Sequence, residues 1–419
     1  MKKREFLKTM ALASLSIPVS ATSLDSFLAS YQHQNVTEDD QFWLAIRGNY
    51  LLKPEYINLE NGYYSMLPQP TLEAYMAQIK YMNLHASHYM RTRMSDDKLI
   101  VRQIMANFLK CSIQEVIITR NTTESLDTII CGLDWQKGDE AIMAEQDYGS
   151  MLDMFKQQAK RYGIVNKFVS VPNHPKNDEE IVALYEQAIT PQTKLIMVCH
   201  MINITGQILP IKKICEMAHK HGVEVMVDGA HAIAHIDFKI SELDCDYYGS
   251  SLHKWLSVPI GAGLLYVKKE KIQKLWPLFG EAGYADDDIR KLNHTGTHPM
   301  HTELTIIHAI NYHQKIGTKR KEDRLRFLQQ YWTSKVKDIP KVVINTPLDN
   351  SRSCGIANIG IKNMPPAEMA KILLEKYKIW TVAINNEKGK VVGCRITPSV
   401  YTTTSELDVF VNAIKEMSA

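Results

Sequence analysis

A carboxylate, a lysine and several small polar side chains follow one another between residues 225 and 267. The apolar run Val225-Met-Val-Asp228 has the composition of a buried strand, and it delivers Asp228 at its C-terminal tip. Further along, the turn Ser251-Leu-His-Lys254 places one lysine among short hydrogen-bonding groups, just ahead of a second apolar strand at residues 263–267. This spacing predicts that the lysine and the carboxylate share one site.

A lysine and a buried carboxylate are what pyridoxal phosphate (PLP) requires of a protein. The lysine amine forms the Schiff base that holds the cofactor, and the carboxylate keeps the pyridine nitrogen protonated so that the ring can accept electrons. Lys254 and Asp228 are therefore the candidate catalytic residues, and PLP is the expected cofactor.

Apolar strand-like runs alternate with helix-like stretches through the middle of the chain. The expected strands cover residues 115–119, 140–144, 194–198, 224–227 and 263–267. The expected helices between them cover residues 123–133, 150–162, 179–188 and 211–221. This βαβ rhythm predicts an α/β fold with a mostly parallel sheet flanked by helices. Ligands of such sheets bind at the carboxyl ends of strands, where both Asp228 and the turn after Thr119 fall.

The rhythm changes near residue 300, where a second part of the chain is expected to begin. A long helical stretch at 302–335 precedes a C-terminal part with strand-like runs at 342–345, 353–361 and 391–397 and a helix at 366–376. Ser405 has the character of an N-cap for a terminal helix. We expect residues 66–300 to form a large PLP-binding domain. Residues 301–419 should form a long helix and a smaller C-terminal α+β domain, joined by residues 22–65.

The first 21 residues have the pattern of an export signal. A basic segment at residues 2–8 precedes a short apolar stretch at 9–19, and Val19-Ser-Ala21 offers small residues for cleavage. Residues 3–8 resemble the twin-arginine export motif with its first Arg replaced by Lys. We expect a periplasmic protein, with Sec export as the second route and a cytoplasmic protein as the alternative. The apolar stretch is shorter than the roughly 20 residues that span a bilayer, so no stable membrane span is expected after cleavage.

The charge and the cysteines exclude several classes of function. The formal net charge is +3, and residues 1–21 account for all of it, with four basic residues against one acidic residue. The neutral remainder gives no electrostatic reason to expect nucleic acid as a partner. The seven cysteines are scattered without CxxC spacing, which favours core residues over a disulfide framework. The chain contains no HExxH motif, and no metal site is expected.

The chain resembles the fold-type I PLP enzymes of the class V aminotransferase family, and its isopenicillin N epimerase-like branch in particular. Cysteine desulfurases and kynureninase are relatives within this family. The resemblance covers nearly everything after the export signal. It rests on Asp228-Gly-Ala-His231 together with Ser251-Leu-His-Lys254, which are specific as a pair.

The resemblance implies a role for each residue around the cofactor ring. Lys254 corresponds to the Schiff-base lysine, and Asp228 corresponds to the partner of the pyridine nitrogen. His231 and Asn203 match residues that approach the phenolic oxygen. Tyr148 matches the aromatic residue that stacks on the ring.

The resemblance also implies how the phosphate and the substrate are held. A turn that opens a helix offers free N–H groups to a dianion, and residues 121–124 match such a turn. The phosphate ligands would be Thr122, Thr123, Ser251, His253 and, from a loop that acts across a homodimer interface, Thr297. Arg395 matches the arginine that holds the carboxylate of a small amino-acid substrate by a bidentate pair.

Several of these residues also have a purely structural interpretation. The threonines at the turn could simply cap a helix. Tyr148 could be an ordinary packed or surface aromatic residue, and Arg395 could pair only with a nearby acid such as Glu406 or Asp408.

We expect an enzyme that acts at the α carbon of an amino acid, with an epimerase-like outcome. A C–S lyase or other β-lyase is the second possibility and an aminotransferase the third. Desulfurases of the family carry a mobile cysteine in the loop before the C-terminal arginine, whereas the corresponding loop at 382–389 has none and Cys394 adjoins Arg395 on a strand-like run. A non-catalytic PLP-fold binding protein is the alternative of a different class, and the presence of Lys254 argues against it.

Overall fold

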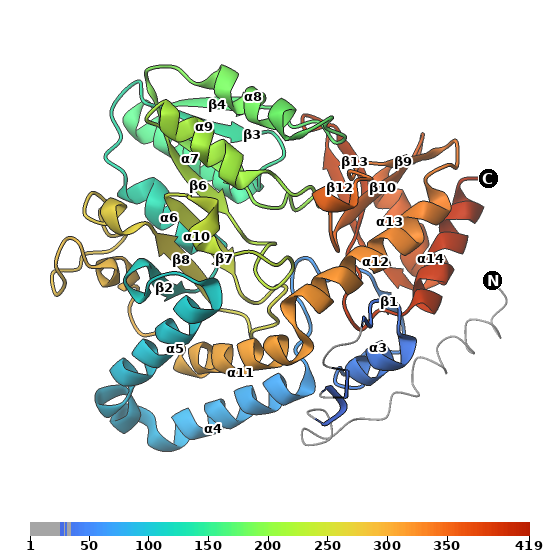
Figure 1. Cartoon of the computed structure of the whole chain (residues 1–419), viewed down its shortest axis with the longest axis horizontal. Coiled ribbons are helices and arrows are strands. Elements are labelled where there is room, and N and C mark those ends of the chain that lie inside the picture. The colour runs from blue at the N-terminus through green and yellow to red at the C-terminus, as the bar shows by residue number, and fades with distance from the viewer. Residues whose placement is uncertain (1–25, 29, 32–34) are drawn as a thin grey trace.

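The computed structural model describes residues 26–28, 30–31 and 35–419, so the expected export signal at residues 1–21 lies outside the described part of the chain. Two lobes lie side by side in Figure 1, each built on its own β-sheet. The larger lobe is a layered α/β structure, and the smaller lobe is formed mainly by the C-terminal part. The predicted fold class is confirmed.

The large sheet has seven strands in the order β2-β8-β7-β6-β5-β3-β4. Neighbouring strands pair in parallel from β4 to β7, and β8 runs antiparallel to both β7 and β2. The strands are β2 (Val116–Thr119), β3 (Glu140–Ala144), β4 (Val165–Val169), β5 (Thr193–Cys199), β6 (Glu224–Asp228), β7 (Tyr247–Ser251) and β8 (Gly263–Val267).

Five of these strands were predicted from their apolar runs, and two were missed. Strand β4 lies at the sheet edge and is only partly buried, and its sequence includes Asn166 and Lys167. Strand β7 is fully buried, but its sequence Tyr-Tyr-Gly-Ser-Ser lacks the aliphatic side chains that mark a buried strand. Ser251, which was expected to open a turn, is therefore the last residue of strand β7.

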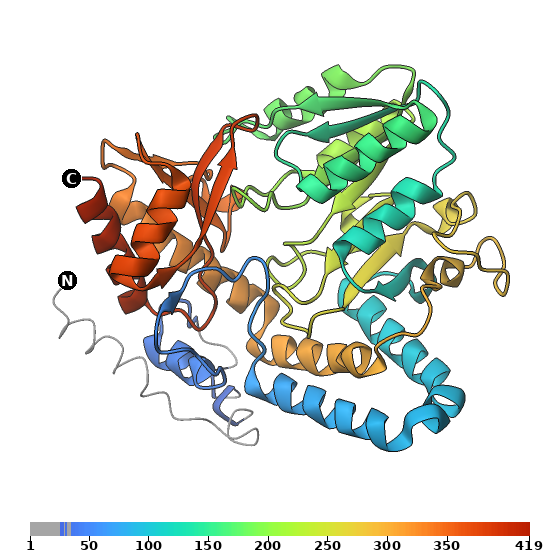
Figure 2. The ribbon, with the colours of Figure 1, turned by 180° about the vertical axis from the view of Figure 1, so that it is seen from behind.

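Helices cover both faces of the large sheet, as a mostly parallel sheet requires. One apolar layer lies between the sheet and the helices α6 (Thr122–Gly132) and α7 (Gly149–Tyr162). The layer on the other face includes residues of α5 (Met94–Leu109), α8 (Asp178–Ala188), α9 (Ile211–Lys220) and α11 (Met300–Ile316). The helix α4 (Gln69–Thr92) lies beside α11, as Figures 1 and 2 both show. A short helix, α10 (Ile240–Leu243), precedes β7.

The helical stretch predicted at 302–335 is wrong in one respect, because it is two helices. Helix α11 ends and α12 (Thr318–Val336) begins at Gly317, whose φ of +96° lies in the region that favours glycine. The break redirects the chain from the large lobe into the small one.

The small lobe contains a four-stranded antiparallel sheet in the order β12-β13-β10-β9. Its apolar core also includes residues of the helices α12, α13 (Pro366–Tyr377) and α14 (Thr404–Met417). The strands are β9 (Val342–Ile344), β10 (Ala357–Ile361), β12 (Val382–Asn386) and β13 (Val391–Ile396).

Two local predictions in this lobe are wrong. Residues 382–389 were expected to be a loop, but most of them form β12, which pairs with β13. The N-cap of α14 is Thr403 and not Ser405, because Thr403 and Glu406 form a reciprocal capping box.

The N-terminal segment crosses to the small lobe before α4 begins. After α3 (Asp40–Arg47), the two-residue strand β1 (Ile57–Asn58) pairs in parallel with β11 (Ile379–Trp380). A further bridge joins Glu60 to Thr397, just beyond the end of β13. Residues 60–63 therefore lie against the small-lobe strand that carries Arg395. No helix of the described residues combines the length and the apolar character needed to cross a bilayer.

Candidate active site

The carboxyl ends of β2, β5, β6 and β7 meet at one edge of the large sheet, because these strands run in the same direction. The register places Cys199 of β5 beside Asp228 of β6. Ser251 ends β7 opposite Gly263 of β8, which in turn pairs with Thr119 of β2. Residues that are far apart in the sequence thus reach one site.

A pocket of about 780 Å³, including its open mouth, lies at this edge. A concave site with a few converging polar groups is the usual form of a ligand or cofactor site. Ten of the eleven predicted site residues line it, and they are Thr122, Thr123, Tyr148, Asn203, Asp228, His231, Ser251, His253, Lys254 and Arg395.

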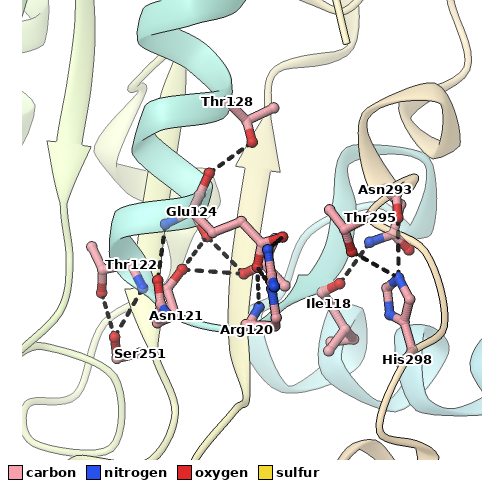
Figure 3. Close-up of polar contacts among 12 residues, drawn as sticks. Ile118, Arg120, Asn121, Thr122, Glu124, Thr128, Ser251, Asn293, Thr295 and His298 are labelled. Atoms are coloured by element: carbon pink, nitrogen blue, oxygen red, sulfur yellow. Dashed lines mark hydrogen bonds and ion pairs between the residues drawn. The ribbon is translucent and has the colours of Figure 1, made fainter. Parts of the chain in front are cut away.

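The eleventh residue, Thr297, does not line the pocket of its own chain and is exposed. The neighbouring segment is tied to the large sheet, since Asn293 Nδ2 donates to the Ile118 carbonyl at 2.7 Å (Figure 3). Within the loop, Thr295 Oγ1 lies 3.2 Å from His298 Nε2. The role of Thr297 across a dimer interface stays a prediction.

Lys254 and Trp255 contact opposite nitrogens of the same imidazole. Lys254 Nζ lies 3.1 Å from His231 Nε2, and the Trp255 indole N–H donates to His231 Nδ1 at 3.2 Å. The ring of His235 stacks on Trp255, with 3.6 Å between the ring centroids. Trp255 therefore fixes the orientation of the His231 ring from the side that faces away from Lys254.

Burial controls the charge of these groups. The pKa of Lys254 is lowered to about 8, mainly by burial, while the Asp228 carboxylate opposes this shift and the Arg395 guanidinium adds to it. Burial also lowers the pKa of His231 well below its usual range, with help from the positive charge of Lys254. The imidazole is consequently neutral, and the lysine keeps a far larger share of neutral amine near neutral pH than an exposed lysine does, although the ammonium form still predominates below pH 8.

Asp228 is a buried carboxylate at the tip of β6. Its Oδ1 accepts a hydrogen bond from the Ala230 N–H at 2.9 Å. Burial raises the pKa of Asp228, while this hydrogen bond and the charge of Lys254 lower it. A buried acid of this kind can stabilise a positive charge placed within the pocket.

The start of α6 and the end of β7 form a cradle of hydroxyl and N–H groups. The Thr122 N–H donates to Ser251 Oγ at 2.9 Å, and the two hydroxyl oxygens lie 2.7 Å apart (Figure 3). Asn121 caps α6 by accepting a hydrogen bond from the Glu124 N–H at 2.9 Å. The positive end of a helix beside hydroxyl groups suits a phosphate.

Two buried polar atoms of pocket residues are without a hydrogen-bond partner among the described residues. They are Asn203 Oδ1 and His253 Nδ1. Burial lowers the pKa of His253 to about 4, so this imidazole is neutral. Because buried polar atoms are normally satisfied, both atoms indicate a polar ligand in the pocket. The cradle, the buried carboxylate and these atoms together fit PLP.

Arg395 lines the pocket, but it pairs with a residue that the sequence did not suggest. Its partner is Glu60, and the expected alternatives Glu406 and Asp408 pair with Arg47 and Lys335. Tyr148, at the start of α7, is 43% exposed and makes no side-chain cap hydrogen bond there. Its ring therefore borders the pocket and is partly exposed to solvent, so its role against the cofactor ring stays a prediction.

Comparison with known proteins identifies the family. A family model described as aminotransferase class V matches residues 57–410. The chain belongs to the class V aminotransferase family. This is a family of PLP-dependent enzymes, so the chain is an enzyme of that kind, and the family likeness expected from the motifs at Asp228 and Lys254 is confirmed.

The relatives of this class V enzyme differ in their reactions. Isopenicillin N epimerase of Streptomyces clavuligerus is 25% identical over 396 residues, which cover 90% of this chain and 98% of that protein. A probable cysteine desulfurase of Halalkalibacterium halodurans is 27% identical over 305 residues, covering 70% of this chain and 73% of that protein.

Solved structures show the same fold. The apo cysteine desulfurase from Thermococcus onnurineus NA1 superposes with a TM-score of 0.79 at 22% identity, covering 89% of this chain and 97% of that chain. A C-DES variant with glycine covalently linked to its PLP cofactor superposes with a TM-score of 0.77 at 21% identity, covering 86% and 96%.

Several residues of the class V site were not predicted. Cys199 lies at the end of β5, and the reasoning that found Asp228 at the end of β6 could have found it. Glu60 gave no signal, because 335 residues separate it from its partner Arg395. The other unpredicted lining residues are Gly62, Met201 and Ala230. In the described part of the chain, no group of three or more His, Cys, Asp or Glu side chains is arranged to hold a metal ion.

Proposed function

We propose that this enzyme holds PLP on Lys254 and moves a proton at the α carbon of an amino-acid substrate, with an epimerase-like outcome. The observation that carries the proposal is the buried Lys254 amine, with a pKa of about 8 and an imidazole nitrogen 3.1 Å away. A buried amine whose pKa lies this close to the operating pH is a base of suitable strength. The alignment with isopenicillin N epimerase over 98% of that protein supports the epimerase-like outcome.

The pocket residues match the parts of PLP in turn. The phosphate would be held by the first-turn N–H groups of α6 and by Thr122, Thr123, Ser251 and His253. The ring would be held by Asp228, His231, Asn203 and Tyr148. When bound, PLP supplies an electron sink that makes a proton on the substrate carbon acidic.

The residues of the chain carry out the proton movement. The Lys254 amine takes the proton from its own side of the α carbon, because its lowered pKa lets it act as a base near neutral pH. An epimerase-like outcome requires a second group to deliver a proton to the opposite face of that carbon. The Asp228 carboxylate balances positive charge in the pocket. Burial of both groups limits the access of water to the proton.

The cysteines argue against sulfur transfer. Cys394 is fully buried on β13, where its Sγ lies 3.5 Å from the Pro366 carbonyl oxygen, and burial raises its pKa to about 12. Cys199 lines the pocket, but burial raises its pKa as well. Because the thiolate is the nucleophile, neither thiol is poised to attack a substrate sulfur.

We also propose that the enzyme is exported and acts as a homodimer. The pattern of residues 1–21 supports export, and the exposed Thr297 beside the anchored loop segment supports a role across an interface. Cell fractionation with mass analysis of the mature N-terminus tests the first point. Light scattering of the purified protein tests the second, and a cytoplasmic, uncleaved monomer would contradict both.

An absorbance spectrum before and after borohydride tests the cofactor assignment. We expect a band near about 420 nm that borohydride fixes onto Lys254. Lys254→Ala should lose this covalent attachment, whereas Lys291→Ala should keep it, because Lys291 is a buried lysine that lies outside the pocket. A protein that stays colourless with added PLP would refute the proposal.

The outcome of the reaction is tested in heavy water. With a panel of amino acids and their derivatives, we expect the α proton to exchange and the opposite enantiomer to appear, as NMR and chiral chromatography would show. Keto-acid formation instead would indicate transamination. Release of a β-substituent would indicate a lyase. Binding of PLP that survives Lys254→Ala, with no turnover in either protein, would favour the binding-protein alternative.

A further inference from the structure

The guanidinium of Arg395 is already bound by a carboxylate of the chain. Glu60 Oε1 accepts a short hydrogen bond from Arg395 Nη2, and Glu60 Oε2 accepts one from Nε at 3.2 Å. A third N–H, on Nη1, donates to the Asn203 carbonyl at 3.2 Å. The side chains of Arg395 and Glu60 are only 8% and 7% exposed. This is a bidentate and nearly buried ion pair.

The backbone around Glu60 is built to hold this pair. Residue 60 bridges to Thr397, two residues beyond Arg395. The Asn61 N–H donates to Thr397 Oγ1 at 2.6 Å, and the Tyr63 N–H donates to Glu60 Oε1 at 3.0 Å. Glu60 is therefore positioned by strand register and by its own backbone contacts.

Gly62 allows the same segment to lie directly on the guanidinium. A Cβ atom at this position would be 3.1 Å from Arg395 Cζ, which is tighter than ordinary van der Waals contact. The segment that carries Glu60 thus covers part of Arg395 and holds the carboxylate beside it.

The pair leaves this end of the pocket without net charge. A substrate carboxylate that displaced Glu60 would leave the Glu60 side chain nearly buried with only the Tyr63 N–H as a donor, and an unpaired buried charge is costly. A carboxylate placed beside Glu60 would meet a like charge. A guanidinium has five N–H donors, and three of those of Arg395 are occupied. The other two can serve an uncharged oxygen.

We propose that Glu60 determines substrate choice by occupying Arg395, so that the pocket prefers amino-acid derivatives with an uncharged carboxyl group, such as amides or esters. Free amino acids bind less well because Glu60 competes with their carboxylate. This inference rests on the proposed function of the pocket and specifies the substrate class for it.

A comparison of L-alanine with L-alaninamide tests the inference, because the two ligands differ in the charge of the carboxyl group. The full-length protein is loaded with PLP, and the dissociation constant of each ligand is measured from the change in the visible band on rapid mixing. The proteins are wild type, Glu60→Gln, the double variant Glu60→Gln/Arg395→Gln, and the control Glu55→Gln. The control removes a carboxylate from an exposed position in the same N-terminal segment.

The quantity compared is the ratio of the dissociation constants for alanine and alaninamide, so the different amine basicities of the ligands cancel between proteins. In Glu60→Gln we expect this ratio to fall by about tenfold or more, because the charge of Arg395 becomes available to the carboxylate. In the double variant, which has no charge at either position, the ratio should return to within about threefold of wild type. Glu55→Gln should match wild type.

Two results would overturn the role of Glu60. One is an unchanged ratio in Glu60→Gln, and the other is a roughly tenfold loss of alanine affinity in the double variant relative to wild type, which would mean that Arg395 already binds carboxylates. If Glu60→Gln fails to fold, the alanine affinity of the double variant decides alone whether Arg395 binds carboxylates, since this variant removes both charges together. The band is recorded before any ligand is added. If the wild-type protein shows no visible band after loading with PLP, the proposed function is overturned together with the role of Glu60. If the band is present and the ratio is unchanged in Glu60→Gln, only the role of Glu60 is overturned.

Discussion

Trp255 fixes the position of the proton on His231. The indole N–H can only donate, so His231 Nδ1, 3.2 Å away, must accept. The neutral imidazole then carries its proton on Nε2, which faces Lys254 Nζ at 3.1 Å. His231 is thereby a hydrogen-bond donor toward the pocket, and Lys254 can accept this hydrogen bond when it is a neutral amine. The lowered pKa makes that form the major one above about pH 8.

Trp255→Phe should release the proton of His231 to either nitrogen. The substitution removes the N–H donor but keeps an aromatic ring against His235. We expect the 15N NMR shifts of labelled histidine to change from one protonated at Nε2 to a mixture of both forms. Turnover should fall by about tenfold, the effect of one lost hydrogen bond in the site.

A second buried tryptophan provides the control for this experiment. Trp135 donates its indole N–H to the Ile130 carbonyl at 2.7 Å and lies outside the pocket. Trp135→Phe should leave the His231 signals unchanged, and His231→Gln assigns those signals. Identical His231 shifts in wild type and Trp255→Phe would show that the tryptophan does not set the tautomer.

The pKa of Lys254 should be visible in the rate at which the apoprotein takes up PLP. The neutral amine is the reactive form, and its pKa is lowered from 10.5 to about 8. Uptake should therefore be fast above pH 8 and slow by about tenfold for each pH unit below it. Stopped-flow absorbance against pH measures this profile. An inflection near the ordinary lysine value would mean that Lys254 is not buried in solution.

Asp228 should shift this profile in a defined direction. Its negative charge stabilises the ammonium form of Lys254 and so raises the lysine pKa against the effect of burial. Asp228→Asn should move the inflection to lower pH by about one unit. Asp127→Asn is the control, because this partly buried acid of α6 does not line the pocket. An upward shift in Asp228→Asn would contradict the assignment.

Much of the site could be predicted because it follows from strand ends. Asp228 and the turn after Thr119 were found from apolar runs, since strands of one direction bring their carboxyl ends to the same edge. The partner of Arg395 could not be found in this way. Glu60 reaches it through the pairing of β1 with β11 and the bridge to Thr397, and neither contact leaves a local pattern in the sequence.

Errors in the fold have equally local causes. Gly317 lies within a stretch of otherwise helical composition, and only its positive φ shows that two helices meet there. Thr403 and Ser405 are both suitable N-cap residues, but Glu406 lies three residues after Thr403. The capping-box spacing could have decided between them. Strand β7 was missed because its buried side chains are aromatic or small and polar.

Ser251→Ala should weaken phosphate binding by the apoprotein by about tenfold to a hundredfold, the loss expected for one hydrogen bond to a charged group. Ser251 Oγ accepts from the Thr122 N–H at 2.9 Å and lines the pocket. Calorimetry with inorganic phosphate measures this affinity without any turnover. Ser250→Ala is the matched control, because its buried hydroxyl donates to the Gly229 carbonyl at 2.8 Å and does not line the pocket. If both variants lose the same affinity, the effect is one of stability and the cradle is not the phosphate site.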